Sequence, residues 1–238
     1  MSSLNEFSYL SKSEDYIVKN FCNLDEYSID VGAARGDFAS QMSLYSKYVI
    51  AIEPNPLKIK ELIKRRNNIR LISNPASSIH GKKVEFRVVS ATPANSTIEP
   101  LNNLEGFDGI EIRQLITVKV DEICNNNTSF VKIDCEGHDL DVLYGAENLI
   151  KNSNPSILVE LRDKHNPGYL IKTFKFLLMM NYIPFLVNEE NISEINIEDN
   201  LIENLENLIK NQETDNNTQD NFLFVHRQDH LSQIKKYI

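Results

Sequence analysis

Acidic side chains stand at the ends of four apolar stretches of this sequence, where carboxylates could bind a ligand or move a proton. These acids are Asp30, Glu53, Asp134 and Glu160. A carboxylate accepts hydrogen bonds from hydroxyl groups and can act as a general base. If the stretches are parallel strands, their carboxyl ends meet at one edge of a sheet, which is where ligands bind. The four acids therefore indicate a functional crevice at that edge.

A turn of small residues follows the first of these stretches. It reads Gly32-Ala33-Ala34-Arg35-Gly36, and Glu53 follows about twenty residues after its start. The spacing is Gly-x-x-x-Gly rather than the Gly-x-Gly-x-x-Gly of dinucleotide sites, whose second glycine lets the backbone approach a pyrophosphate. The turn therefore favours a ligand without phosphates, such as S-adenosylmethionine (SAM). A tight turn without a ligand and a nicotinamide dehydrogenase site are the alternatives.

The elements that must position these residues alternate along the chain. Such alternation predicts an α/β fold, with a mostly parallel sheet covered by helices on both faces. The two closing strands are expected to form an antiparallel hairpin at one sheet edge. Strands are expected at 27–31, 48–52, 69–72, 130–134, 156–161, 182–187 and 221–226, and helices at 5–22, 36–45, 54–66, 138–151 and 168–181.

Two stretches depart from this alternation. Residues 82–120 predict two exposed strands around a polar loop, which is either a lid or a surface hairpin. Residues 188–220 are rich in asparagine and predict a polar insertion with one helix over 197–209. We therefore expect an N-terminal helical segment over 1–25 and one domain over 26–238 that carries both insertions.

Composition limits the partners of the chain. A net charge of −9 over 238 residues argues against a nucleic-acid binder, because phosphate contacts need a basic face. Three cysteines without metal or disulfide spacing predict a reducing compartment. No stretch is apolar enough for a membrane span or an export signal, so we expect a cytoplasmic protein.

Three segments resemble the FkbM family of SAM-dependent methyltransferases. They are Asp30-Val31-Gly32-Ala33-Ala34-Arg35-Gly36, Ile52-Glu53-Pro54 and the stretch 131–146, which reads Val-Lys-Ile-Asp-Cys-Glu-Gly-His-Asp-Leu-Asp-Val-Leu-Tyr-Gly-Ala. The resemblance covers about residues 26–226 and implies a class I methyltransferase fold, a Rossmann-like three-layer sandwich. Its sheet would have seven strands, mostly parallel, with the last strand antiparallel. In the turn, this chain has Ala34 where the family usually has Asn.

The resemblance also implies a cofactor site for SAM. Its residues would be Asp30, Gly32, Ala33, Gly36, Glu53 and Asn74, with Gly32 near the methionine part, Glu53 on the ribose hydroxyls and Asn74 near the adenine. Asp30 would hold the amino group, or only cap the following helix. Asn74 could equally shape a turn before Pro75.

Methyl transfer to a hydroxyl needs alignment of the reacting atoms and removal of a proton. Asp134 is the first choice for this base, with Glu136, Glu160 and His165 as further candidates. His138 could also reach the crevice, or be only a first-turn residue of its helix. Asp134, Glu136 and Glu160 could form an oxygen site for magnesium, but the chemistry does not require one and we predict no metal.

The resulting prediction is an O-methyltransferase that acts on a hydroxyl of a sugar, glycan or glycosylated metabolite. The alternative is a non-catalytic domain with the same fold that binds a ligand or serves as a scaffold. The exposed hairpin over 82–120 could also pair with a second copy of the chain.

Overall fold

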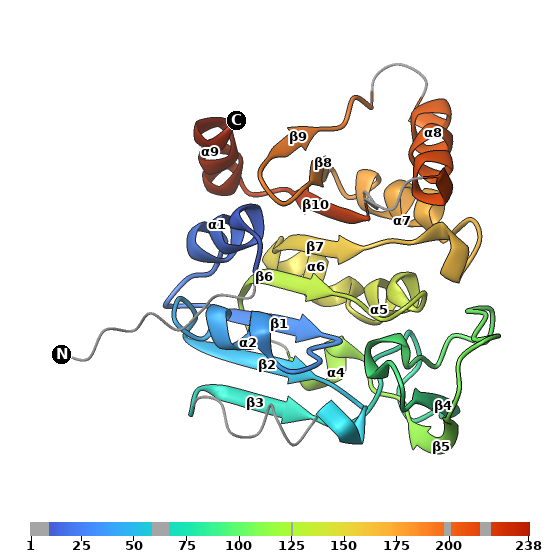
Figure 1. Ribbon diagram of the computed structural model, residues 1–238. Coiled ribbons are helices and arrows are strands. Elements are labelled where there is room, and N and C mark those ends of the chain that lie inside the picture. Colours follow the sequence, from blue (N-terminus) through green and yellow to red (C-terminus); the bar gives the residue numbers. More distant parts are fainter. Residues whose placement is uncertain (1–9, 59–66, 125, 198–200, 215–219) are drawn as a thin grey trace.

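The computed structural model describes residues 10–58, 67–124, 126–197, 201–214 and 220–238. Its eight-stranded main sheet has the order β3-β2-β1-β6-β7-β10-β8-β9 (Figure 1). The strands are β1 Tyr27–Val31, β2 Tyr48–Ile52, β3 Ile69–Ile72, β6 Thr128–Ile133, β7 Ser156–Glu160, β8 Ile183–Val187, β9 Ile192–Glu194 and β10 Asn221–Val225.

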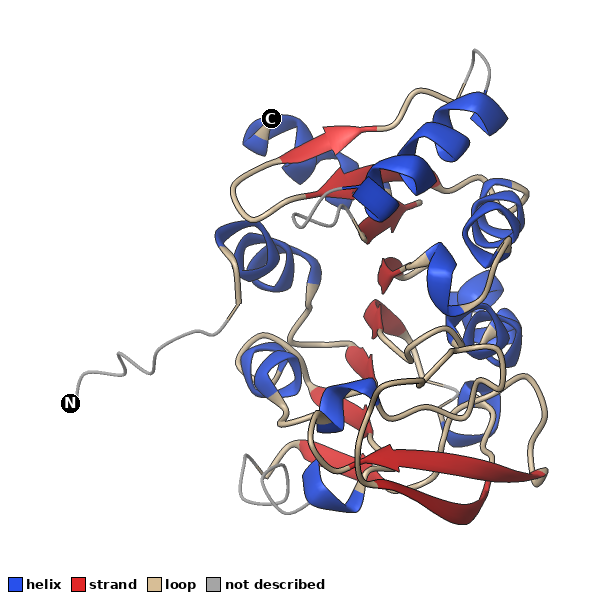
Figure 2. Ribbon diagram, turned by 45° about the vertical axis from the view of Figure 1, so that its right-hand side comes forward, coloured by secondary structure: helices blue, strands red, loops and turns tan. Residues whose placement is uncertain are grey.

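Helices cover both faces of this sheet, which makes a three-layer sandwich (Figure 2). On one face lie α1 Lys12–Phe21, α2 Asp37–Met42 and α9 Gln228–Tyr237. On the other lie α4 Val120–Ile123, α5 Asp139–Gly145, α6 Glu147–Ser153, α7 Tyr169–Leu178 and α8 Leu201–Thr214. Side chains alternate between faces along each strand, so Ile29 and Val31 join the second group while Asp30 faces the first.

The class I methyltransferase fold is confirmed, with one difference in the strand count. β1 to β3, β6 and β7 run parallel, and β10 runs antiparallel to both of its neighbours, as expected for the last strand. The prediction of seven strands is wrong because Ile192–Glu194, in the polar insertion, adds an eighth strand beside β8. β8 and β10 do pair antiparallel, but β10 lies inside the sheet and β9 forms the edge.

The described helices are shorter than expected at several ends. The capping box between Ser11 and Glu14 starts α1 at Lys12, so the expected helix over 5–22 loses its first residues, of which 5–9 lie outside the described part. The helix over 54–66 begins at Pro56, and 59–66 also lie outside. The helix over 138–151 is divided into α5 and α6 at Ala146.

A separate two-stranded sheet interrupts the main alternation. β4 Lys83–Val89 and β5 Ile110–Ile116 pair antiparallel, and the loop between them holds a short 3-10 helix, η1 Pro93–Asn95. A second 3-10 helix, η2 Asp163–His165, follows β7. The β4–β5 sheet sits beyond the carboxyl ends of β1, β2 and β6 (Figure 1). Among the described helices, none is long and apolar enough to cross a membrane.

Candidate functional site

The candidate site lies where the chain order of the sheet reverses. β1 is flanked by β2 on one side and β6 on the other, so the loops after these strands separate and leave room for a ligand. Two hollows open at this edge and share Gly32, Ala34 and Asp134. The hairpin-side hollow is also lined by Glu53, Ala76, Phe86, Thr97, Glu136 and His138, among others. The helix-side hollow is also lined by Leu10, Asp30, Ala33, Phe38, Lys132 and Glu160, among others.

The turn after β1 uses its own amide groups within the protein. The N–H groups of Gly32 and Ala33 both donate to the carbonyl of Ile52, at 2.9 and 3.1 Å. The N–H of Ala34 donates to Oε2 of Glu53 at 2.7 Å. Because these donors are already engaged, the turn does not offer the amide cradle that holds a phosphate group.

Gly32 is required by the protein itself. It has a φ of 76°, and a Cβ at this position would lie 1.8 Å from the carbonyl oxygen of Asp134. The loop after β6 therefore presses directly on the loop after β1. Ala34 also has a left-handed φ, at 45°, without the freedom of a glycine. Gly36, at φ 83°, starts α2 and is not among the residues that line either hollow.

Glu53 closes β2 with a buried carboxylate. Its two oxygens accept the N–H groups of Ala34 at 2.7 Å and Asn55 at 2.6 Å. Burial raises the pKa of Glu53 to about 7, and these two hydrogen bonds offset only part of that effect. Each oxygen keeps a lone pair, so the carboxylate can accept further hydrogen bonds from hydroxyl groups in the hairpin-side hollow.

Asp30 is almost completely buried beside the helix-side hollow, with 1% of its surface exposed. Burial raises its pKa to about 6, although the charge of Lys132 and an N–H from Ala39 act in the opposite direction. Within the described part of the chain, Oδ2 of Asp30 has no hydrogen-bond partner. An unpartnered buried carboxylate oxygen is costly, so it indicates a place for a donor from a ligand.

Lys132 is the buried cation of this edge. Its Nζ lies 2.8 Å from Oδ2 of Asp134 and 5.3 Å from the ring centre of Phe38. Burial alone would lower the pKa of Lys132, but Asp134, Asp30 and Glu160 together hold it above its usual value. Lys132 is therefore a buried lysine that is paired with a carboxylate. Asp134 keeps 29% of its side chain exposed, where the two hollows meet.

Glu160 is already paired at its place beside the helix-side hollow. Arg162 reaches Glu160 at 2.9 Å and Asp220 at 2.7 Å. Burial, and then the charge of Asp134, raise the pKa of Glu160 well above its usual value. This arrangement suits a structural acid better than a free proton acceptor.

Glu136 is held in a left-handed conformation, with a φ of 51°. Its carbonyl accepts hydrogen bonds from Thr97 at 3.1 Å and Asn102 at 2.9 Å, so the loop of the hairpin fastens this turn. Burial raises the pKa of its carboxyl group to about 8. His165 lies behind it, with Nδ1 3.3 Å from Oε2 of Glu136, and lines neither hollow.

The short distance between Glu136 and His165 does not describe an ion pair. Burial also lowers the pKa of His165, to about 4, so both groups are neutral near pH 7. Oε2 of Glu136 makes no hydrogen bond within the described part, despite the proximity of the ring. Glu136 therefore presents a protonated carboxyl to the hairpin-side hollow, and His165 supports it from behind.

Asn74 does not reach the hairpin-side hollow. Its amide donates instead to the carbonyl of Ile116 at 2.9 Å, at the end of β5. The residues just after it, Pro75 and Ala76, line the hollow in its place. The side chain of Asn74 is thus engaged with the end of the hairpin, and its contact with adenine stays a prediction.

The sequence predicted the hairpin but not which of its residues reach the candidate site. Phe86 and Thr97 form part of the hollow wall, and Glu99 lies 3.2 Å from Nδ1 of His138. The alternation of apolar residues in β4 was visible in the sequence. The contact between the hairpin loop and the turn after β6 was not visible, because it joins segments that lie about forty residues apart and share no pattern.

The chain is similar in sequence to one protein family and in structure to solved methyltransferases. The family described as "Methyltransferase FkbM domain" matches residues 30–214. No curated protein matches the chain in sequence. A methyltransferase FkbM from Methylobacillus flagellatus KT has a similar structure, with a TM-score of 0.52 and 16% identity over 86% of this chain. This chain spans only 44% of the length of that protein.

A second solved structure is similar over nearly its whole length. It is an rRNA methylase from Streptococcus thermophilus, with a TM-score of 0.50 and 9% identity, and the match covers 90% of this chain and 93% of that one. At such low identity both structural matches show the fold alone.

Proposed function

This chain belongs to the FkbM methyltransferase family, and on that basis we propose that it moves a methyl group from SAM to a hydroxyl of a sugar, glycan or glycosylated metabolite. SAM supplies a methyl carbon on a positively charged sulfonium, and it leaves as S-adenosylhomocysteine when an acceptor oxygen takes that carbon. The single observation that carries the proposal is the pair of hollows joined at Gly32, Ala34 and Asp134.

The helix-side hollow fits the methionine end of this cofactor. Asp30 provides an unpartnered buried oxygen that can accept from an ammonium group. Asp30, Asp134 and Glu160 together outnumber the one buried lysine of this hollow, Lys132. An excess of carboxylates favours a cationic ligand.

The hairpin-side hollow fits the adenosine end. Glu53 can accept hydrogen bonds from two ribose hydroxyls, and Phe86 and Ala76 supply apolar wall. The engaged amides of the turn between β1 and α2 argue against a dinucleotide, whose pyrophosphate would need them.

Asp134 is the proposed base. Lys132 holds its Oδ2 at 2.8 Å, which fixes the carboxylate and leaves Oδ1 to take the proton of an acceptor hydroxyl. Glu136 remains a candidate to bind the acceptor, because a protonated carboxyl can donate a hydrogen bond to an oxygen. Glu160 and His165 are proposed to position these two residues.

A transfer assay tests this proposal. Purified protein is incubated with SAM and a panel of free sugars, glycans and glycosides, and S-adenosylhomocysteine and a product heavier by one methylene are measured by mass spectrometry. Product that requires both an acceptor and Asp134 supports the proposal. A product methylated on nitrogen or carbon would overturn the choice of a hydroxyl.

A non-catalytic domain is the second candidate, and one observation favours it. Two of the acids that line the helix-side hollow are already paired with basic groups, Asp134 with Lys132 and Glu160 with Arg162. Tight binding of S-adenosylhomocysteine, with no transfer to any acceptor in the panel, would select this candidate.

A further inference from the structure

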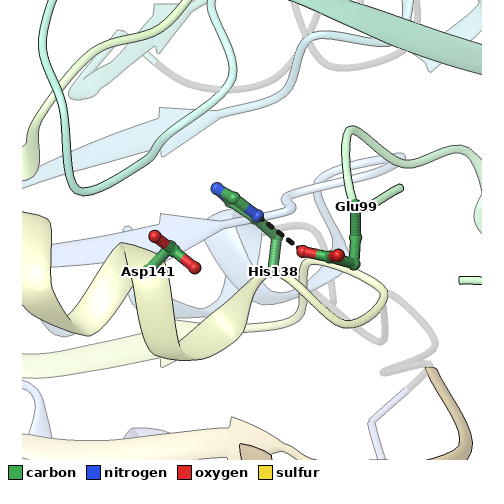
Figure 3. A group of neighbouring side chains, drawn as sticks. All are labelled: Glu99, His138 and Asp141. Atoms are coloured by element: carbon green, nitrogen blue, oxygen red, sulfur yellow. Dashed lines mark hydrogen bonds and ion pairs between the residues drawn. The ribbon is translucent and has the colours of Figure 1, made fainter. Parts of the chain in front are cut away.

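Three side chains that can bind a metal gather under the β4–β5 hairpin, and none belongs to the proposed methyl-transfer chemistry. They are Glu99, from the hairpin loop, His138, just before α5, and Asp141, in its first turn (Figure 3). One ligand atom from each lies within 4.8 Å of the others. We propose that this Glu99 cluster binds a divalent cation.

The separations suit an ion with only small movements of the side chains. Oε2 of Glu99 and Nδ1 of His138 are 3.2 Å apart, which matches two ligands of one ion. Metal–ligand bonds of about 2.0–2.2 Å let two ligands of the same ion lie up to about 4.4 Å apart. The imidazole of His138 lies between the carboxylates of Asp141 and Glu99 (Figure 3), and one ligand atom of each lies within 4.8 Å of the others, so a shift of about half an ångström closes the set.

The charges of the cluster also call for a cation. Glu99 is buried, and its carboxylate has His138 as its only ion-pair partner within the described residues. Arg87 is close, but it donates to the main-chain carbonyl of Glu99. In the same described part, no lysine or arginine forms an ion pair with Asp141 either. Two carboxylates gathered around one imidazole are well compensated by a bound cation.

Outer hydrogen bonds already orient two of the three ligands. Oγ of Ser77 lies 3.0 Å from Nε2 of His138 and can accept its proton, which frees the Nδ1 lone pair for a metal. Oδ1 of Asp141 accepts from Ser78 at 2.7 Å, and Oδ2 accepts from Tyr169 at 3.2 Å. Partners of this kind fix the tautomer and direction of metal ligands.

The segment that carries Ser77 and Ser78 packs closely against α5. A Cβ on Gly145 would lie 2.2 Å from the carbonyl oxygen of Ser77, so only glycine lets the helix approach this closely.

One imidazole and two carboxylates form a ligand set between those preferred by zinc and by magnesium. Mn²⁺ is therefore our probe, because it also avoids the free cysteines, Cys22, Cys124 and Cys135, that could capture zinc.

The test is a titration of chelator-treated protein with Mn²⁺, followed by electron paramagnetic resonance of the free ion. We expect one ion per chain, and at least about tenfold weaker binding in Glu99→Gln. The amide oxygen of this variant still accepts the N–H of Leu101, which Oε1 of Glu99 binds at 3.1 Å, so the loop should stay folded. Glu105→Gln is the matched control, because Glu105 is an exposed acid of the same loop.

Either of two results would overturn the proposal. One is no Mn²⁺ binding by the wild-type chain at millimolar ion, which would leave the cluster as a hydrogen-bond network. The other is equal binding in Glu99→Gln and the wild type. Neither result depends on methyl transfer, so the metal site and the proposed function can fail separately.

A different observation carries a second proposal, on the outer edge of β5. Arg87 of β4 exchanges main-chain hydrogen bonds with Thr97, at 2.9 and 3.1 Å, on the side away from β5. Bonded and non-bonded pairs alternate in an antiparallel ladder, so Ile112, opposite Arg87, turns its main-chain groups outward. By the same alternation, so do Ile110 and Gln114.

This edge is apolar and exposed. Ile110, Ile112 and Ile116 are 41%, 58% and 53% exposed as whole residues. Proteins normally protect such an edge strand from pairing with another chain. Asn74 covers only its end, by its hydrogen bond to the carbonyl of Ile116.

We infer that the edge pairs with β5 of a second copy, antiparallel about Ile112. In this register Ile112 meets Ile112 and Ile110 meets Gln114, so the outward main-chain groups face one another. Glu111 then lies opposite Arg113 of the second copy, where opposite charges stabilise the pair. A shift of two residues either way would oppose Glu111 to Glu111 or Arg113 to Arg113, so charge complementarity selects the register.

Light scattering after gel filtration tests this dimer. We expect a dimer at about 100 μM protein, a monomer for Glu111→Arg, and a restored dimer for Glu111→Arg combined with Arg113→Glu. Met179→Lys, at an exposed position on another element, is the control and should stay dimeric. A monomeric wild type, or a dimer unaffected by Glu111→Arg, would overturn the pairing.

Discussion

The two hollows at the carboxyl edge of the sheet differ in how their acidic groups are charged. The helix-side hollow is a set of buried charges balanced around Lys132. Burial raises carboxyl pKa values in both hollows, but Lys132 opposes the shift at Asp30, which reaches about 6, whereas Glu53 and Glu136 of the hairpin-side hollow reach about 7 and about 8. One hollow is thus prepared for a cationic group and the other for a neutral, hydroxyl-bearing one.

The largest expected effect comes from Asp134, where the hollows meet. Asp134→Asn should lower kcat by about 100-fold or more, because it removes the proposed proton acceptor. Binding of S-adenosylhomocysteine, measured by calorimetry, should change little, because the amide keeps the shape of the side chain. Equal losses of kcat and of binding would assign Asp134 to the cofactor instead.

Removal of the buried cation should mainly affect stability. Lys132→Met leaves Asp30, Asp134 and Glu160 without their shared counter-charge, and we expect a loss of about 3–5 kcal/mol in the free energy of unfolding. Urea denaturation measures this loss. The double variant Lys132→Met/Asp30→Asn should recover part of it, and no recovery would show that Lys132 acts by packing alone.

The helix-side hollow could be predicted from sequence better than the hairpin-side one. Asp30, Asp134 and Glu160 follow from strand ends, because parallel strands must bring such ends together. The sequence predicted the hairpin as a pair of strands. It did not predict the hydrogen bonds that Thr97 and Asn102 donate to the carbonyl of Glu136. Those contacts depend on how two distant segments dock, and neither segment carries a pattern that reports it.

The structure gives Gly32 a reason that the sequence did not show. Gly32 was expected to admit a ligand, but its lack of a side chain is needed first by the carbonyl of Asp134. The eighth strand was missed because Ile192–Glu194 is short and lies within a polar, asparagine-rich stretch. The single apolar residue of this strand, Ile192, gives no periodicity to detect.

The pH dependence of stability should report the hairpin-side hollow. Glu53 and Glu136 have folded pKa values above their unfolded values, so the folded state binds more protons and stability falls as pH rises through these values. His165 and His230 have folded pKa values lowered to about 4, so deprotonation of the unfolded histidines near pH 6.5 opposes this trend at the low end of the range, but it is the smaller effect.

Between about pH 6.5 and about pH 8 we expect a loss of roughly 2 kcal/mol in the ligand-free protein. Thermal unfolding across this range checks the direction. Glu136→Gln should flatten the profile, and a profile that rises with pH would contradict the raised pKa values of both acids.

The smallest effect should come from the turn that joins the hollows. Ala34 has a φ of 45°, which costs an L-residue about 1–2 kcal/mol, while glycine loses about 0.5–1 kcal/mol of chain entropy. Ala34→Gly should therefore stabilise the protein by about 0.5–1 kcal/mol. Ala33→Gly, at a residue without a left-handed φ, should destabilise it in the same melting experiment.

Calorimetric binding of adenosine and of S-adenosylhomocysteine tests most directly whether the two hollows form one cofactor site. We predict that Glu53→Gln weakens both ligands at least about tenfold, because each loses its ribose contact, and that Asp30→Asn weakens only S-adenosylhomocysteine. Unchanged binding of S-adenosylhomocysteine in both variants would contradict the placement of the cofactor across the two hollows.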